Sequence, residues 1–245
     1  MRSAITNSLL DFPKKRITIN LAPAELPKDR AHYDLPIALS ILCVSGQLTQ
    51  KELEGAVFAG ELALNGDLRP IKGAINITQT AKKAGFKQIY LPNSNVKQAS
   101  LIDNIEIFGI KSLKQLFLHL KKESVIQPYL INEAAQPDDI TLLSPSLDDI
   151  KGQEQAKRAL IKLLSGHHNI LLSGAPGAGK TMLAKTLANL LPELSKEEQI
   201  EATKIHSLAG KIDGEIITKR PFRSPHHTAS SVSIIGGGII LNQMK

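Results

Sequence analysis

The stretch Gly174-Ala175-Pro176-Gly177-Ala178-Gly179-Lys180-Thr181 decides the fold of the second half of the chain. It matches the pattern G-x-x-x-x-G-K-[ST], in which a glycine-rich loop joins a strand to a helix. The apolar run at residues 169–173 predicts a buried parallel strand before the loop. Leucines at helical spacing after it predict a helix that ends before Pro192. With both flanks in place, the loop predicts a phosphate-binding site rather than an ordinary glycine-rich turn.

The residue types at residues 174–181 match the chemistry of a triphosphate site. Glycines let backbone N–H groups approach phosphate oxygens closely, and a helix N-terminus adds positive potential. We expect the Lys180 ammonium to contact the β- and γ-phosphates and the Thr181 hydroxyl to ligate Mg²⁺. The predicted cofactors are therefore ATP and Mg²⁺, held by all eight residues of the loop.

Composition excludes several classes of protein. The chain has 245 residues, of which 42% are hydrophobic and 22% charged, so we expect a globular rather than a disordered protein. The net charge of +7 is spread over both halves, which permits nucleic-acid binding without demanding it. The first residues lack the apolar core of a signal peptide, and no apolar run approaches the ~20 residues of a membrane span. We therefore expect a cytoplasmic protein. The single cysteine, Cys43, lies in an apolar run and is interpreted as a buried structural thiol.

Residues 1–122 form one unit in which strand and helix signals alternate, which predicts an α/β or α+β fold, and we expect α/β. Asn65-Gly66 between two apolar runs predicts a hairpin turn, and Ser112-Leu113-Lys114-Gln115 resembles a capping box that opens a helix. The expected strands are 16–21, 58–64, 68–71, 88–91 and 105–110, and the expected helices are 34–44, 73–84 and one beginning after Ser112.

A second unit is expected at residues 148–245. Residues 123–147 carry three prolines among polar and acidic residues, which is typical of a linker. After the linker, residues 154–165 predict a helix with an apolar stripe along one face. The stripe comprises Ala156, Ala159, Leu160, Leu163 and Leu164.

Several strings resemble known families. Asp149-Ile150-Lys151-Gly152-Gln153, upstream of the loop, resembles the adenine-side segment of AAA+ ATPases. The rarer string at residues 220–228, followed by Gly236-Gly237-Gly238, resembles the magnesium-chelatase subunit I branch of that family. In the first unit, residues 16–24, 34–39, 60–62 and 66–71 resemble the Lon-protease-like domain of the YifB/ComM family.

The resemblance to the YifB/ComM family covers essentially the whole chain, and it implies a fold and a function. The fold would be an incomplete Lon-protease-like domain (ribosomal S5 domain 2-like) followed by the N-terminal half of an AAA+ P-loop NTPase domain. Intact relatives would be ATP-driven rings, homo-hexameric, that act on single-stranded or branched DNA and promote branch migration in natural transformation. The alternatives are a chelatase-like ATPase that remodels proteins, and an inactive remnant.

The Lon-like resemblance does not extend to proteolysis. Pro27-Lys28-Asp29 resembles the segment before the family's nucleophile, yet it continues Arg30-Ala31-His32-Tyr33 without a serine. The position of the dyad lysine falls near Ile77. Because a Ser–Lys pair needs the amine to activate the hydroxyl, we expect no protease activity.

The resemblance also leads us to expect a fragment shortened at both ends. Family members begin several tens of residues earlier, and no apolar strand ending in Asp-Glu follows Thr181. The expected Walker B pair, sensors and arginine finger would thus be missing. Since an arginine finger alone contributes about 10³ to 10⁵ in rate, we expect ATP binding without appreciable hydrolysis, and we assign no catalytic residue.

A small basic cluster precedes the histidines in the string at residues 220–228. By analogy with insertions that face the pore of ring ATPases, Lys219, Arg220 and Arg223 could contact DNA phosphates. A solvated hairpin is the equally acceptable alternative. His226 and His227 are adjacent and do not have helical metal-ligand spacing, so a metal site there is not favoured.

Overall fold

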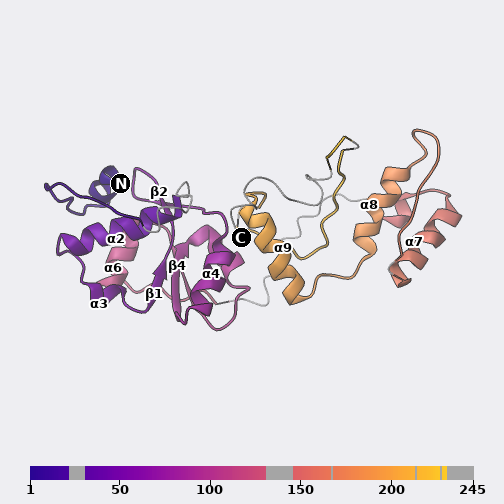
Figure 1. The fold of residues 1–245 in the computed structure, drawn as a ribbon. Helices are drawn as coiled ribbons and strands as arrows, with labels where there is room; N and C mark the ends of the chain where they lie inside the picture. The colour runs from indigo at the N-terminus through magenta and orange to yellow at the C-terminus, as the bar shows by residue number, and fades with distance from the viewer. Residues whose placement is uncertain (22–30, 131–145, 167, 213, 227, 231–245) are drawn as a thin grey trace. The chain divides into compact units, whose positions relative to one another are not determined.

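The computed structural model describes residues 1–21, 31–130, 146–166, 168–212, 214–226 and 228–230 (Figure 1). The chain divides into two units, each described by itself below. The first comprises Met1–Asp139 and Leu194–Thr218, and the second comprises Ile140–Glu193 and Lys219–Lys245. The segment Leu194–Thr218 therefore belongs to the unit that the earlier part of the sequence builds, although it follows the glycine-rich loop in the chain.

A three-stranded parallel sheet forms the centre of the first unit, in the order β1-β4-β5. β1 is Ala56–Phe58, β4 is Gln88–Pro92 and β5 is Glu106–Ile110. A separate two-stranded hairpin pairs β2 (Glu61–Leu62) with β3 (Leu68–Arg69) around the predicted Asn65-Gly66 turn. The expected first hairpin strand was too long, because Phe58 pairs with Tyr90 in the parallel sheet instead.

Helices cover both faces of this sheet. Successive side chains of each strand point to opposite faces, so they pack into two different cores. Tyr90 and Phe108 face a core that includes α2 (Asp34–Val44) and α6 (Leu113–Leu120). Ile89, Leu91 and Ile107 face the opposite core. That core includes α4 (Ala74–Lys83) and α5 (Val96–Ala99). Figure 1 shows α2 and α6 on one side of β1 and β4, and α4 on the other. The first unit is thus an α/β fold.

An aromatic stack crosses all three strands on the α2 side of the sheet. The ring centroid of Tyr90 lies 4.9 Å from that of Phe58 and 4.7 Å from that of Phe108, with nearly parallel planes. Such offset stacks add to the burial of the rings themselves. The stack therefore joins β1, β4 and β5 through one face.

The predicted helices of the first unit form close to their expected ends. α2 spans the expected residues, and α4 lies between Gly73 and Ala84 as its caps. Ser112 caps α6 by accepting a hydrogen bond from the Gln115 N–H at 3.2 Å. The Gln115 side chain accepts from the Lys111 N–H rather than from that of Ser112, so the capping box is shifted by one residue. The remaining short helices are α1 (Arg2–Asn7), η1 (Ala31–Tyr33), α3 (Gln50–Leu53) and η2 (Asn93–Asn95).

The expected strand at residues 16–21 is wrong. These residues lie in neither a helix nor a strand, and together with α2 they line a groove of about 950 Å³. Ile17 packs against the first core, but Ile19 on the same side of the alternation is 50% exposed. Alternation alone does not make a strand where the described residues offer no sheet edge alongside to pair with.

The second unit contains η3 (Leu147–Asp149), α7 (Glu154–Gly166) and α8 (Lys180–Leu190). Ile150, Leu160 and Leu183 form its small core. Leu160, on the predicted stripe, is fully buried. The helix that follows, α9 (Lys196–Leu208), belongs to the first unit. Residues 131–145 of the expected linker lie outside the described residues.

Candidate functional site

The residues before the glycine-rich loop lie in neither a helix nor a strand, so they do not form the predicted strand. Ile170 and Leu172 pack against the core of the second unit, whereas Leu171 between them is 91% exposed. This one-sided burial differs from the two-sided burial that the apolar run predicts. The reason is that no strand among the described residues lies beside residues 169–173 to pair with their backbone.

The loop itself reverses direction through left-handed backbone conformations at glycine. Gly177 has φ of 80° and Gly179 has φ of 82°, and a Cβ at either residue would meet open space. Backbone conformation, not crowding, therefore requires glycine at these two positions. All of the residues from Gly174 to Gly179 are exposed, so the whole loop presents its backbone on the surface.

Helix α8 begins immediately after the loop and leaves its first-turn amides without a side-chain cap. Gly179 is its N-cap and has no side chain to accept from the first N–H groups. These N–H groups have no partner inside the helix, and the helix dipole adds positive potential at the same end. The arrangement suits an anionic ligand at the start of α8.

Lys180 folds its side chain back over the loop. Its Nζ donates hydrogen bonds to the carbonyl oxygens of Gly174 at 2.8 Å and Ala175 at 2.6 Å. The ammonium group is therefore held at the beginning of the loop, while Thr181 next to it is exposed at the start of α8.

The basic residues predicted to contact DNA follow the end of the segment Leu194–Thr218. Lys219 and Arg223 are exposed, and Arg220 is half-buried. The exposed His226 contacts Thr228 Oγ1 through its Nδ1 at 2.7 Å, and His227 lies outside the described residues. Over the described part of the chain, no group of three or more His, Cys, Asp or Glu side chains is placed to hold a metal ion.

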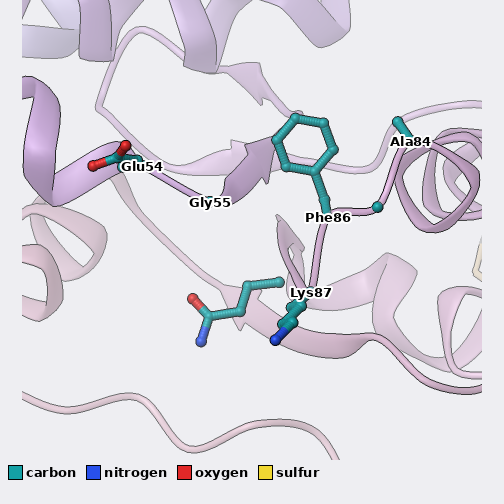
Figure 2. Close-up of a pocket in the computed structure, with 7 residues that line it drawn as sticks. Glu54, Gly55, Ala84, Phe86 and Lys87 are labelled. Atoms are coloured by element: carbon teal, nitrogen blue, oxygen red, sulfur yellow. The ribbon is translucent and has the colours of Figure 1, made fainter.

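The first unit has a pocket of about 460 Å³ at the amino-terminal ends of β1 and β4 (Figure 2). Glu54, Gly55, Phe86 and Lys87 contribute to its lining. Ligands of open α/β sheets bind at the carboxyl ends of parallel strands, so this pocket lies at the opposite edge. It therefore adds no candidate site.

The structure places Ile77, the position expected for a dyad lysine, on α4 against the second core of the first unit. Residues 27–30, which precede the expected nucleophile position, lie outside the described residues. Cys43 is half-buried beside the first core. Burial, followed by the nearby Glu52 carboxylate, raises the pKa of the Cys43 thiol, which disfavours the reactive thiolate. Across the described residues, none of the helices is long and apolar enough to cross a lipid bilayer.

Two family models match separate parts of the chain. The model for magnesium chelatase, subunit ChlI, matches residues 146–243, which contain the glycine-rich loop. A second model, subunit ChlI of Mg-chelatase, matches residues 1–95 of the first unit. The match to residues 146–243 covers the described part of the second unit and also the segment Leu194–Thr218 of the first unit.

Similar proteins extend these matches across almost the entire chain. The YifB protein of Salmonella typhimurium is 43% identical over 244 residues, covering 98% of this chain and 47% of that protein. Competence protein ComM of Haemophilus influenzae is 40% identical over 245 residues, with 98% of this chain and 47% of that protein covered. The chain thus spans about half the length of these curated relatives. An archaeal Lon protease of Methanothermobacter thermautotrophicus is 46% identical over 54 residues, which is 22% of this chain and 8% of that protein.

Proposed function

Because the chain belongs to the YifB/ComM family, we propose that it binds ATP with Mg²⁺ at residues 174–181 and forms part of a ring-shaped motor that acts on DNA. The proposed assembly is a homo-hexamer, as the resemblance to AAA+ rings implies, and its proposed location is the cytoplasm. Sedimentation velocity with and without Mg-ATP tests the assembly. The nucleotide site and the DNA contact are tested separately below.

One observation carries the nucleotide proposal: an uncapped helix N-terminus, two left-handed glycines and a lysine ammonium gather at one exposed loop. The ammonium already bonds to two carbonyl oxygens of the loop, so it sits where the loop begins. In the proposed complex, phosphate oxygens replace these carbonyl partners, and the first-turn amides of α8 donate to the same phosphates. The Thr181 hydroxyl ligates the Mg²⁺ that bridges the phosphates.

Calorimetry with Mg-ATP tests the site. Lys180→Ala is expected to weaken binding at least tenfold, because it removes the charge that meets the phosphates. Lys185→Ala is the matched control, since Lys185 is an exposed lysine on the same helix and should leave affinity unchanged. Equally weak heats for wild type and Lys180→Ala would contradict the proposal and favour an inactive remnant.

The DNA proposal rests on the exposed cations Lys219 and Arg223 beside Arg220, and on the similarity to a competence protein. Phosphate contacts make affinity fall with salt, by a slope of about −0.7 per neutralised phosphate on single strands. Arg223→Glu should weaken single-stranded DNA binding and reduce the salt slope by about one contact. Lys114→Glu, an equal charge change at an exposed position on α6, should do neither. Identical slopes for wild type and Arg223→Glu would exclude a phosphate contact at this residue.

A chelatase-like ATPase that remodels a protein is the rival function, and both family-model matches favour it as strongly as they favour a DNA motor. The two differ in their target. A forked-DNA unwinding assay on an intact relative separates them: unwinding supports the DNA motor, whereas ATP-dependent protein remodelling without DNA activity supports the rival.

A further inference from the structure

The segment Leu194–Thr218, here called the docking arm, is held against the rest of the first unit by a largely buried polar network. The Ser207 hydroxyl accepts a hydrogen bond from the Gly73 N–H at 2.9 Å and donates one to Gln98 Oε1 at 3.1 Å. Gln98 Nε2 in turn donates to the Glu215 carbonyl oxygen at 3.0 Å. Gln98 is fully buried and Ser207 is 2% exposed, so the two bonds of Ser207 are shielded from water, whereas the bond to the exposed Glu215 is part-buried. Ser207 on α9 thus fixes the position of the arm relative to Gly73 and Gln98.

Glycines allow the arm and the first unit to approach closely. A Cβ on Gly73, whose φ is +72°, would lie 2.9 Å from Leu208 Cδ2 of the arm. A Cβ on Gly214, whose φ is +87°, would collide with the backbone carbonyl of Ser94 in the first unit. Because these glycines sit on both sides of the contact, the fit is specific to this pair of surfaces.

Polar side chains make the hydrogen bonds of the dock. The buried residues of α9 are Thr203 and Ser207, while the apolar side chain of Ile205 is 62% exposed. Thr203 serves the arm itself, because its Oγ1 accepts from the Ile217 N–H at 3.1 Å. The ion pair of Lys196 with Asp103, at 2.7 Å, has both side chains about half exposed and contributes little. Leu194, at the start of the arm, is only 7% exposed, so the arm buries apolar as well as polar side chains.

The arm is joined directly to the helix that carries the loop. α8 begins with Lys180 and ends at Leu190, and residues 191–193 connect it to the first residue of the arm. Only these three residues therefore separate the helix that begins at the glycine-rich loop from the first residue of the arm.

We propose that docking of the arm on the first unit and nucleotide binding at residues 174–181 are coupled, so that the first unit responds to the nucleotide. The proposal rests on the nucleotide site proposed above. Such coupling is reciprocal: whatever nucleotide does to the dock, the dock does to nucleotide affinity, with typical factors of about 5 to 150.

Hydrogen exchange and calorimetry on the full chain test the coupling together. Saturating Mg-ATP is expected to change the exchange rates of the α9 amides about fivefold or more. Ser207→Ala, which removes the central hydroxyl without adding bulk, should raise exchange in α9 and change the Mg-ATP affinity. If nucleotide speeds α9 exchange, the variant must bind more tightly; if nucleotide slows it, the variant must bind more weakly.

Two further variants complete the test: one is a control outside the dock, and the other disrupts the dock at a second position. Ser40→Ala is the matched control, because the Ser40 hydroxyl bonds only the Pro36 carbonyl of its own helix among the contacts described for it and is exposed. Gly214→Ala disrupts the dock from the arm side if Ser207→Ala leaves α9 protected. The amides of β4 should keep their protection throughout, which excludes global unfolding.

The possible outcomes separate the two proposals. Absence of Mg-ATP binding by the wild type, with α9 still protected, overturns the nucleotide site and the coupling with it. Normal Mg-ATP binding that leaves α9 exchange unchanged, and an affinity that is the same in undocked variants, overturns the coupling alone. The coupling is also overturned if Mg-ATP speeds α9 exchange while Ser207→Ala weakens Mg-ATP binding, or if Mg-ATP slows exchange while the variant binds more tightly. Either result violates reciprocity.

Discussion

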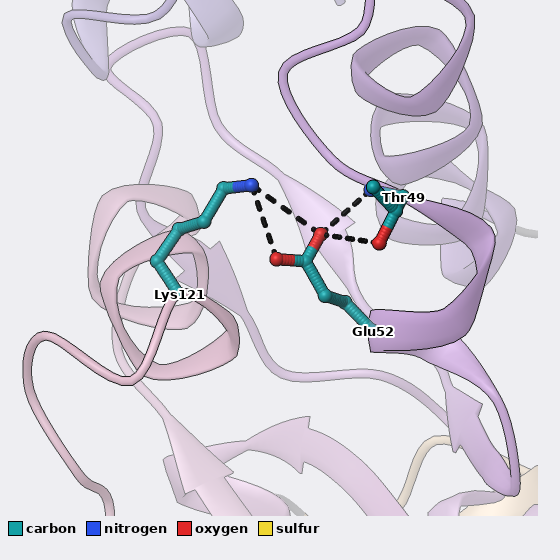
Figure 3. Close-up of polar contacts among 3 residues, drawn as sticks. All are labelled: Thr49, Glu52 and Lys121. Carbon is teal, nitrogen blue, oxygen red and sulfur yellow. Dashed lines mark hydrogen bonds and ion pairs between the residues drawn. The ribbon is translucent and has the colours of Figure 1, made fainter.

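Lys121 places its ammonium nitrogen 3.0 Å from one carboxylate oxygen of Glu52 and 3.3 Å from the other, across 69 residues of sequence (Figure 3). The same carboxylate accepts from the Thr49 N–H at 2.6 Å and the Thr49 hydroxyl at 3.0 Å, which closes the N-terminus of α3. Two bonds to Thr49 and one ion pair thus converge on one side chain. The short helix α3 is joined to the end of α6 through it.

Glu52→Gln should lower the free energy of unfolding by about 1 kcal/mol at pH 7, because it removes the charge from these bonds. Two hydrogen bonds lower the pKa of Glu52 below 4.5: the larger effect comes from the Thr49 N–H and the second from the Lys121 ammonium. Its contribution is therefore present above that value and lost as pH falls through the lower folded-state pKa. Urea denaturation at pH 7 and pH 3 checks this: the difference between wild type and variant should shrink at pH 3. Glu54→Gln, an exposed neighbour, should show no difference at either pH.

Asn95→Ala should cost about 2 to 4 kcal/mol of unfolding free energy. The Asn95 side chain accepts from the Ile71 N–H at 2.9 Å and donates to the Ile71 carbonyl at 3.0 Å, and it is 1% exposed. Truncation leaves both backbone groups buried without their partner, and each such group costs about 1 to 3 kcal/mol. Asn93→Ala is an exposed control and should change stability by less than about 0.5 kcal/mol. Equal urea midpoints for the two variants would exclude this role for Asn95.

His119 should make the first unit sensitive to mild acid. Its Nδ1 accepts from the Ile126 N–H at 3.0 Å, so the neutral ring carries its proton on Nε2, 3.0 Å from the Tyr90 hydroxyl oxygen. Burial lowers the pKa of His119 below 6.5, so its stabilising contribution is present above 6.5 and is lost as pH falls through the lower folded value. Protonation would place a second hydrogen opposite the Ile126 N–H.

Unfolding free energies at pH 7 and pH 5 measure this effect. The wild type should lose more stability over this interval than His119→Phe, which cannot titrate. Tyr90→Phe keeps the aromatic stack and the Ile126 bond, and it should retain the pH dependence of the wild type. A His119→Phe variant that loses as much stability as the wild type would show that other groups cause the acid sensitivity.

Thr181→Ala should weaken nucleotide binding about tenfold in the presence of Mg²⁺ and have little effect in EDTA. The reason is that the proposed role of the hydroxyl is to ligate the metal ion, not the phosphates. Displacement of a fluorescent ATP analogue in both buffers measures the two affinities. A similar loss in both buffers would indicate a structural role for Thr181 at the start of α8. Thr80→Ala, at a helix position whose hydroxyl bonds the Asn76 carbonyl, should change neither affinity.

The sequence was sufficient wherever a local signal and the tertiary packing agree. Gly73 and Ala84 flank α4, and Ser112 caps α6, because these residues satisfy helix ends with their own backbone or side chain. The glycine-rich loop was predictable for the same reason, since its glycines and Lys180 act within a few residues of each other. The expected strand at residues 88–91 is β4, and its successive side chains pack alternately into the two cores: Ile89 and Leu91 into one and Tyr90 into the other.

Predictions failed where the deciding partner is distant in sequence. Residues 16–21 alternate like a strand, and residues 169–173 are apolar like one, but pairing requires a neighbouring strand that neither sequence pattern can supply. The docking of α9 was also missed, because the Gly73–Ser207 bond joins residues 134 positions apart. The only local signal was a pair of small polar residues, Thr203 and Ser207, one turn apart on a helix that glycines follow.

The stack of Phe58, Tyr90 and Phe108 has a consequence for how the sheet assembles. A slip of β5 by one residue against β4 would turn Phe108 toward α4 and bring Ile107 or Gly109 opposite Tyr90. The three rings can meet only when both strand pairs are aligned as observed. The aromatic side chains therefore favour the observed register during folding, because a misaligned sheet lacks the ring contacts that stabilise it.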